Sequence, residues 1–270
     1  MHPPSALAAR LARVGLLAAA AVGLVGCGLM EAPASPATSG RVRSSPPVIV
    51  SPDASDEVPT LRPVPSGAVD LIGAADALAD LDSYRVSVLS QGLVPSSARD
   101  GRVTMTSTLI QGDRPAAAFT MTGVDGLEGL GDGPLHAIVI GDEAWLRSGT
   151  GRWAKSPGGA ADFDAAFTTL SPTELVAGFE ALAPAFVKVG PETKNGQATT
   201  HYRVDAADPV AIEAGLTAGG ADVWLGRDAG ELIAILVDGT VDVDGTVTPV
   251  VLQIDVNHID DPTNRVRPPA

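Results

Sequence analysis

Most of the chain after residue 83 alternates apolar and polar residues with a period of two, interrupted by glycine-containing turns. In Val103–Leu109, Thr104, Thr106 and Thr108 alternate with Val103, Met105, Ser107 and Leu109. Ala117–Met121 repeats the alternation. This pattern is typical of antiparallel strands with one polar face. Asn195-Gly196 lies between two further strand-like segments and predicts a tight hairpin. The chain is therefore expected to form one large antiparallel sheet of about ten strands.

A few short segments show helical spacing instead. Ser66 is the expected N-cap of a first helix, and Ser171-Pro172-Thr173-Glu174 has the arrangement of a capping box with proline at the first helical position. Asp208-Pro209 begins a third helix, which is expected to stop at Gly219-Gly220. Between Gly159 and Pro184 the apolar spacing is helical throughout. These few helices must cover the apolar face of the sheet.

These elements indicate an α+β fold. A long antiparallel sheet coils, so we expect a large curved sheet, or half-barrel, with the short helices on its concave face. Where the facing residues are small, helices laid into a concave sheet leave an apolar groove. Ala, Gly and Val are abundant here and aromatic residues make up only 4% of the chain.

The N-terminus has the parts of a secretory signal. Arg10 and Arg13 form a basic region, and Val14–Val25 is an apolar run too short to span a bilayer comfortably. Leu24-Val25-Gly26-Cys27 resembles the bacterial lipobox, in which the cysteine is diacylated and becomes the first residue of the mature protein. We therefore expect residues 1–26 to be a lipoprotein signal peptide and Cys27 to be lipidated. The alternatives are that Cys27 is an ordinary cysteine of an apolar run, or that the segment is an uncut membrane anchor.

The chain divides into a linker and one folded domain. Residues 27–65 are rich in Pro, Ser, Ala and Thr, a composition that cannot bury enough apolar surface to fold, so they are expected to be a disordered tether. A single domain is expected over residues 66–270. Within it, Gly123–Pro134 is glycine-rich and is expected to be a mobile loop.

Charge and motif content narrow the function. The formal charge of −14 argues against nucleic acid as a partner and favours solubility. With one cysteine no intramolecular disulfide can form. His136, His201 and His258 lack the spacing of metal ligands, and no nucleophile elbow, zinc-protease motif or phosphate-binding loop is present. The sequence therefore predicts a protein without enzymatic activity, cofactor or metal.

The three tryptophans, Trp145, Trp153 and Trp224, allow two interpretations. Exposed aromatic rings on a hairpin could stack on sugars, whereas a tryptophan opposite small side chains in a sheet is more often part of the core. The core position is the one expected here.

Several hairpin motifs together resemble the LppX/LprA/LprF/LprG group of bacterial lipoproteins, which share the LolA/LolB-like half-barrel. The resemblance spans residues 67 to 260 and follows the same order of lipobox, tether, helix and sheet with inserted helices. The segments that carry it are Ile140-Gly141-Asp142-Glu143-Ala144-Trp145, Gly151-Arg152-Trp153, Val223-Trp224-Leu225, Gly230-Glu231-Leu232 and Asp255-Val256-Asn257-His258.

The resemblance implies a lipid-binding cavity between the sheet and the helices. Phe163, Phe167, Leu175 and Phe179 lie on the apolar faces of the expected helices and are the candidates to line it. The alternative is that these four side chains fill a closed core.

Two hypotheses about function follow. The first is a monomeric carrier or chaperone on the extracytoplasmic side of the cell membrane, held there by the Cys27 lipid. It would bind the acyl chains of a lipid or lipoglycan, and a transporter is a possible further partner. The second is a non-enzymatic envelope binding or assembly module with a filled core that recognises a protein or glycan. An envelope hydrolase is a third hypothesis, which the absence of the catalytic motifs named above disfavours.

Overall fold

The structure, a computed structural model, describes residues 68–92, 101–123, 133–164, 168, 171–243 and 245–270. Ser66, Cys27 and the expected signal and tether therefore lie outside the described residues. So do Phe167 and residues 124–132 of the glycine-rich segment.

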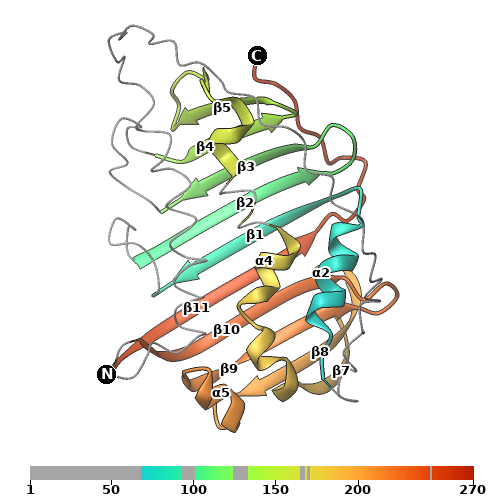
Figure 1. The fold of residues 1–270 in the computed structure, drawn as a ribbon, viewed down its shortest axis with the longest axis vertical. Coiled ribbons are helices and arrows are strands. Elements are labelled where there is room, and N and C mark those ends of the chain that lie inside the picture. The colour runs from blue at the N-terminus through green and yellow to red at the C-terminus, as the bar shows by residue number, and fades with distance from the viewer. Residues whose placement is uncertain (1–67, 93–100, 124–132, 165–167, 169–170, 244) are drawn as a thin grey trace, which may run out of the picture.

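All the described strands belong to one antiparallel sheet, in the spatial order β6-β5-β4-β3-β2-β1-β11-β10-β9-β8-β7. Strands consecutive in the sequence are neighbours in the sheet, except β6 and β7, which lie at its opposite edges, and β11 also pairs with β1 (Figure 1). The sheet is open, with β6 and β7 at its two edges, and curved, which confirms the expected architecture. The strands are β1 (Ser83–Gln91), β2 (Arg102–Ile110), β3 (Ala116–Thr122), β4 (Leu135–Ile140), β5 (Glu143–Ser148), β6 (Ala154–Lys155), β7 (Val187–Lys194), β8 (Gln197–Asp205), β9 (Leu216–Gly226), β10 (Leu232–Val243) and β11 (Thr246–Asn257).

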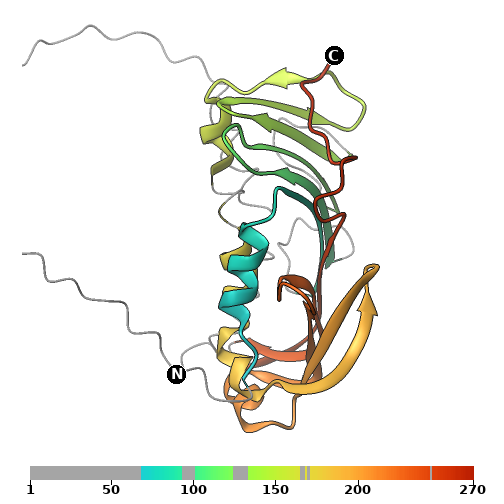
Figure 2. The ribbon, with the colours of Figure 1, turned by 90° about the vertical axis from the view of Figure 1, so that its right-hand side faces the viewer.

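The helices lie on one face of this sheet, as the side view shows for α2 and α4 (Figure 2). The alternation in the strands matches: in β4, Leu135, Ala137 and Val139 are buried while the residues between them are half-buried. One face therefore packs under helices and the other faces away. The helical elements are α2 (Leu71–Ala79), α4 (Pro172–Ala177), α5 (Pro209–Glu213) and the two 3-10 helices η3 (Gly159–Phe163) and η4 (Glu180–Ala185).

The apolar interior on the helix side consists of two clusters. The larger, called here the α2 cluster, joins α2, α4, η4 and α5 to strands on both sides of β11 and includes Leu78, Phe179, Leu216 and Ile254. The smaller, the η3 cluster, contains Val103, Phe119, Met121, Leu135, Ala137, Val139, Ala144, Leu146 and Phe163. Among the described residues, η3 thus covers β2 to β5, whereas α2, α4, η4 and α5 cover β1 and β8 to β11.

Local signals account for two of the helix starts. The Ser171 hydroxyl accepts a hydrogen bond from the Glu174 amide at 3.3 Å, and the Asp208 carboxylate accepts one from the Val210 amide at 2.8 Å. Both N-caps are confirmed. The Asn195-Gly196 hairpin between β7 and β8 is confirmed as well, with positive φ at both residues.

Three expectations about the helices were wrong. The first helix begins at Leu71 and is capped by Asp70, whose carboxylate accepts from the Gly73 amide, and not by Ser66. In the segment from Gly159 to Pro184, Gly159–Phe163 and the residues from Glu180 onward form short 3-10 helices on either side of α4. Pro184 removes a backbone donor there, which favours short turns over a continuous helix.

The third helix is shorter than expected. It ends at Glu213, and Gly219 and Gly220 lie inside β9 instead of terminating the helix. The φ of Gly219 is +83°, and a β-carbon at that position would collide with the Asp238 carbonyl of β10. These glycines therefore permit a close approach of two strands.

Within the ranges described, no helix is both long and apolar enough to cross a membrane.

Candidate ligand cavity

A cavity of about 460 Å³ lies on the helix side of the sheet, at the end of β1 to β4 nearest the β2–β3 turn. Its deepest residues, Tyr84, Ala117 and Val139, are buried, and Gly112 and Pro115 at the turn are exposed. The cavity therefore opens toward that turn. Its lining residues are Tyr84, Leu109, Ile110, Gln111, Gly112, Pro115, Ala116, Ala117, Val139, Gly141, Ala160, Asp164, Ser171 and Pro172.

The cavity separates the two apolar clusters. Tyr84 belongs to the α2 cluster, and Leu109 packs against that cluster from its edge. On the opposite wall, Val139 belongs to the η3 cluster and Ala160 packs against it. The free volume is thus the place where the two parts of the core do not meet.

Small side chains leave this gap open. Ala117 pairs with Leu109 on one side and Val139 on the other, so an alanine stands in the middle of three neighbouring strands. Ala160 faces the same space from η3, and Gly141, with φ of +54°, turns the chain between β4 and β5. A groove beneath helices is the consequence expected of a core rich in alanine and glycine.

Polar groups are few in the lining, and most lie toward the opening. Asp164 is exposed, and Gln111 is half-buried and reaches the Leu78 carbonyl at 3.5 Å. Tyr84 is the one titratable residue of the deep wall, and burial raises the pKa of its hydroxyl to about 12. The inner cavity is therefore uncharged at neutral pH, with its carboxylate at the mouth.

The structure places the three described candidates from the sequence in the core beside this cavity. Phe163 is 2% exposed, and its ring meets that of Phe119 edge to face, with the centroids 5.8 Å apart. Leu175 and Phe179 lie in the α2 cluster, on the other side of the gap. None of the three is among the residues that line the cavity, so their contact with a ligand stays a prediction.

The elements that carry these candidates do reach the cavity, through neighbouring residues. Ala160 and Asp164 flank Phe163, while Ser171 and Pro172 form the start of the helix that carries Leu175. The candidates predicted from the sequence all lie on the expected helices, so they do not include the strand residues Tyr84 and Leu109. The period-two pattern in β1 and β2 already placed both on the helix face and was the signal available.

Two of the three tryptophans depart from their expected core position. Trp145 and Trp153 are half-buried and belong to neither cluster. Trp145 lies between the buried Ala144 and Leu146, so strand alternation turns it away from the helices. Trp224 is 7% exposed and has the expected core position, in a third cluster with Ile233 and Ala234 on the helix-free face.

The histidines of the described chain have polar neighbours and no metal-like grouping. Thr120 and His136 are hydrogen-bonded at 3.0 Å, and His201 lies 2.7 Å from Asp222. The described ranges contain no group of three or more His, Cys, Asp or Glu side chains placed to hold a metal ion.

Fold and cavity together define a class of protein: an open antiparallel sheet with helices on one face and a mainly apolar cavity between the layers. Comparison with solved structures finds distant similarities. The Mycobacterium tuberculosis lipoprotein LppX is 18% identical, with 72% of this chain and 94% of that chain covered and a TM-score of 0.39. LprF from Mycobacterium bovis is 16% identical, with 76% and 100% covered and a TM-score of 0.44.

A LolA superfamily protein from Nitrosomonas europaea is 10% identical, with 74% of this chain and 93% of that chain covered and a TM-score of 0.23. These are the lipoprotein group and the superfamily that the hairpin motifs indicated, and a likeness of this size concerns the fold alone. No protein-family model and no curated protein matches the sequence.

Proposed function

We propose that this protein binds an acyl chain of a lipid or lipidated molecule in the cavity between sheet and helices, and acts as a non-enzymatic carrier or chaperone in the cell envelope. The observation that supports this most strongly is the cavity of about 460 Å³ between the two apolar clusters. Its volume is within the usual range for small-molecule sites, roughly 300 to 1,000 Å³, and its deep wall carries no charge.

The energetics are sufficient for reversible binding. Each buried methylene contributes about 0.8 kcal/mol, so about ten methylenes would contribute about 8 kcal/mol before the entropy of association is subtracted. That gross value corresponds to micromolar affinity at best, which suits a protein that must also release its ligand. The polar end of the ligand would stay at the mouth, near Gln111 and Ser171.

The side chains predicted from the sequence have a place in this proposal. Phe163 borders the gap on one side, and Leu175 and Phe179 border it on the other. An acyl chain longer than the present cavity would have to part the two clusters, and it would then touch these residues, while Phe167 is proposed as a contact from the sequence alone. We therefore keep all four as proposed contacts of the buried end of the chain.

The anchor is the second part of the proposal. Lipidation of Cys27 would hold the mature protein on the extracytoplasmic side of the membrane, because two acyl chains anchor a protein far more firmly than one. The proline-rich residues up to 65 would then act as a tether between the lipid and the domain. The expected partners are the lipid ligand, the membrane and a transporter.

Native mass spectrometry of the mature protein, purified from a lipid-containing host and followed by organic extraction, tests this function. The expected result is a protein population heavier by the mass of a lipid, with that lipid recovered in the extract. A lipid-free protein that also fails to take up added fatty acid would contradict the proposal. It would favour a binding module with a filled core.

A further inference from the structure

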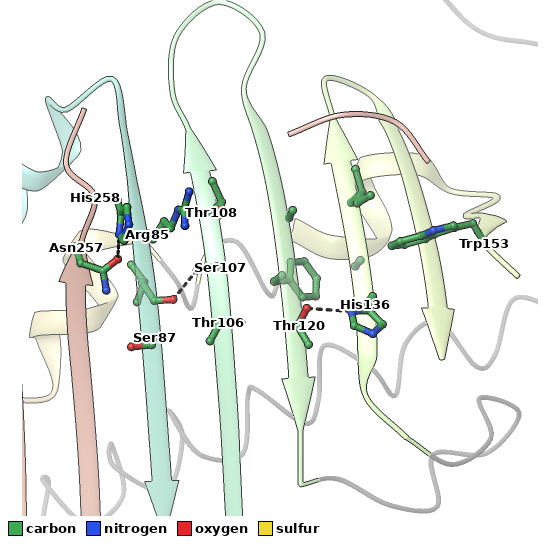
Figure 3. A pocket seen from close by; sticks show the side chains of 15 residues that line it. Arg85, Ser87, Thr106, Ser107, Thr108, Thr120, His136, Trp153, Asn257 and His258 are labelled. Atoms are coloured by element: carbon green, nitrogen blue, oxygen red, sulfur yellow. Dashed lines mark hydrogen bonds between the residues drawn. The ribbon is translucent and has the colours of Figure 1, made fainter. Parts of the chain in front are cut away.

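The helix-free face of the sheet carries a second hollow, of about 470 Å³, that the acyl-chain site does not use. It extends over β11, β1, β2, β3 and β4, and Trp153, from the segment after β5, stands at one end (Figure 3). The side chains of Arg85, Ser87, Thr106, Thr108, Thr120 and His136, which alternate with the buried residues of their strands, point away from the helices, so the sheet separates this row from the apolar cavity.

Polar side chains cross this hollow in a straight row. Strand register pairs Ser87 with Thr106, Thr106 with Thr120, and Thr120 with His136. Figure 3 shows the four side chains in line across β1 to β4. Because neighbouring strands are about 4.8 Å apart, hydrogen-bonding groups recur at that spacing along the row. A ligand with several hydroxyl groups could pair with them in succession.

An indole closes one end of the row. Trp153 is half-buried, and its ring lies 6.4 Å from that of His136. The Arg147 guanidinium carbon lies 4.7 Å from the Trp153 ring centroid, which holds the indole in place. An aromatic plane beside a row of hydroxyls provides both contacts that a sugar ring requires, apolar for its C–H face and polar for its hydroxyls.

Charge around the hollow is positive in a protein that is acidic overall. No carboxylate is among its lining residues, which include Arg85, His136 and His258, although the whole chain carries 32 acidic and 18 basic residues. Burial and the neighbouring Arg147 lower the pKa of His136, so this ring is neutral at pH 7 and can accept as well as donate. Fixed positive charge is supplied by Arg85 in the lining and by Arg147, which contacts Trp153.

The donors of the two arginines are engaged differently. The Arg147 Nε is buried and has no hydrogen-bond partner among the described residues, which is rare in a folded protein. Arg85 donates to Asn264 and Thr263 of the C-terminal segment through Nε and Nη2. Asp261 lies in the same C-terminal segment. Hydrogen bonds with Thr263, and then the charges of His258 and Arg85, lower the pKa of its carboxyl group, so its negative charge offsets part of the positive charge of Arg85.

We propose that this hollow binds an acidic sugar, with its ring on Trp153, its hydroxyls on the Thr106–Thr120 row and its anionic group toward the arginines. This site is independent of the acyl-chain site, and each can fail without the other. It would add recognition of a glycan to the binding of a lipid chain on the opposite face of the same sheet.

Calorimetric titration of the full chain, in a detergent without sugar head groups, tests the site with glucuronate, glucose and acetate as probes. Glucuronate is expected to bind, and glucose and acetate to bind at least about tenfold more weakly. Equal binding of glucose would overturn the assignment of an acidic ligand. Absence of glucuronate binding would overturn the site itself.

Two variants and a matched control locate the binding. Thr106→Val removes one hydroxyl of the row and Trp153→Ala removes the stacking surface, and each is expected to weaken glucuronate about fivefold to tenfold. Thr104→Val changes the same residue type on the same face of β2, outside the hollow, and should leave the affinity unchanged. Unfolding by urea checks that all three variants are folded. Unchanged affinity in folded Thr106→Val and Trp153→Ala proteins would contradict the proposal.

Discussion

The imidazole of His201 and the indole of Trp224 stack with their centroids 4.6 Å apart and their planes only 9° from parallel. Glu192 joins the pair from β7: its carboxylate accepts from the Trp224 indole at 2.9 Å and lies 3.3 Å from His201 Nδ1. Lys194 lies over the same indole, 4.5 Å from its centroid. This cluster fastens edge strand β7 to the helix-free face of β8 and β9.

His201→Phe would retain the ring stack but remove both polar contacts of the imidazole. The Asp222 side chain is only 9% exposed. It would keep its ion pair with Arg203 and lose the 2.7 Å contact with the His201 imidazole. We expect the free energy of unfolding to fall by about 2 kcal/mol, since a buried polar group is left short of a partner. Urea denaturation measures it.

Glu143→Gln is the control for this variant. It breaks the 2.6 Å ion pair with Lys155, in which both side chains are about half exposed, so it should destabilise the protein much less than His201→Phe, because water screens such a pair. An equal loss in the two variants would show that the His201 contacts contribute no more than a surface ion pair.

Tyr84 should make stability fall at alkaline pH. Burial raises the pKa of its hydroxyl from 10.0 to about 12, so the folded protein keeps this proton over a range in which the unfolded chain has lost it. The contribution is fully present below pH 10 and is lost as the pH rises to 12, on the order of 2 to 3 kcal/mol.

The protein has two tyrosines, so tyrosinate absorbance of the Tyr202→Phe variant reports on Tyr84 alone. The folded variant should titrate near pH 12 and the urea-unfolded variant near pH 10. Titration of the folded variant at the unfolded value would refute the buried position of this hydroxyl in the cavity wall.

Filling the cavity should abolish acyl-chain binding while sparing the fold. Ala160 is half-buried and faces the free volume from η3, so Ala160→Phe would extend a ring into the space that the ligand needs. We expect uptake of a fluorescent fatty acid to fall by at least about tenfold, with little change in unfolding. Ala154→Phe, at an exposed alanine of β6, is the matched control and should bind normally. Normal binding by a folded Ala160→Phe protein would place the ligand elsewhere.

Asn264 should hold the C-terminal segment against the sheet. It is 8% exposed and donates to the Ser83 hydroxyl and the His258 carbonyl, while its own oxygen accepts from Arg85 at 2.9 Å. Asn264→Ala should lower stability by about 2 kcal/mol and expose the segment to proteases. Limited proteolysis measures the exposure of the segment. Arg265→Ala, at the exposed neighbouring residue, is the control variant. Similar cleavage of both variants would contradict the role of Asn264.

The architecture could be predicted from sequence because its signals are local. Alternation in β2 and β3, the caps at Ser171 and Asp208, and the Asn195-Gly196 turn each depend on residues within a few positions of one another. The errors arose where distant contacts decide the outcome. Gly219 and Gly220 look like a helix stop, yet glycine is required there by the close approach of β10 at Gly219 and of the β8 backbone at Gly220.

The cavity could be anticipated in kind but not in place. The abundance of alanine and glycine predicted a groove under the helices, but its position depends on Ala117 and Ala160 facing each other from elements more than forty residues apart. The fold-back of the β7–β8 hairpin is also non-local, because the Asn195 amide donates to Val256 and Ile233 carbonyls of β11 and β10. Neither contact leaves a sequence pattern.

The most direct test of the central claim is photo-crosslinking of the full chain with a fatty acid that carries a diazirine near its methyl end, followed by peptide mapping. Labels are expected on the walls of the helix-side cavity, at Tyr84, Leu109, Val139 or Ala160, and with longer chains at Phe163, Phe167, Leu175 or Phe179. An excess of unlabelled fatty acid should abolish them. Labelling confined to the helix-free face, or labelling that competitor does not reduce, would contradict an acyl-chain site between the sheet and the helices.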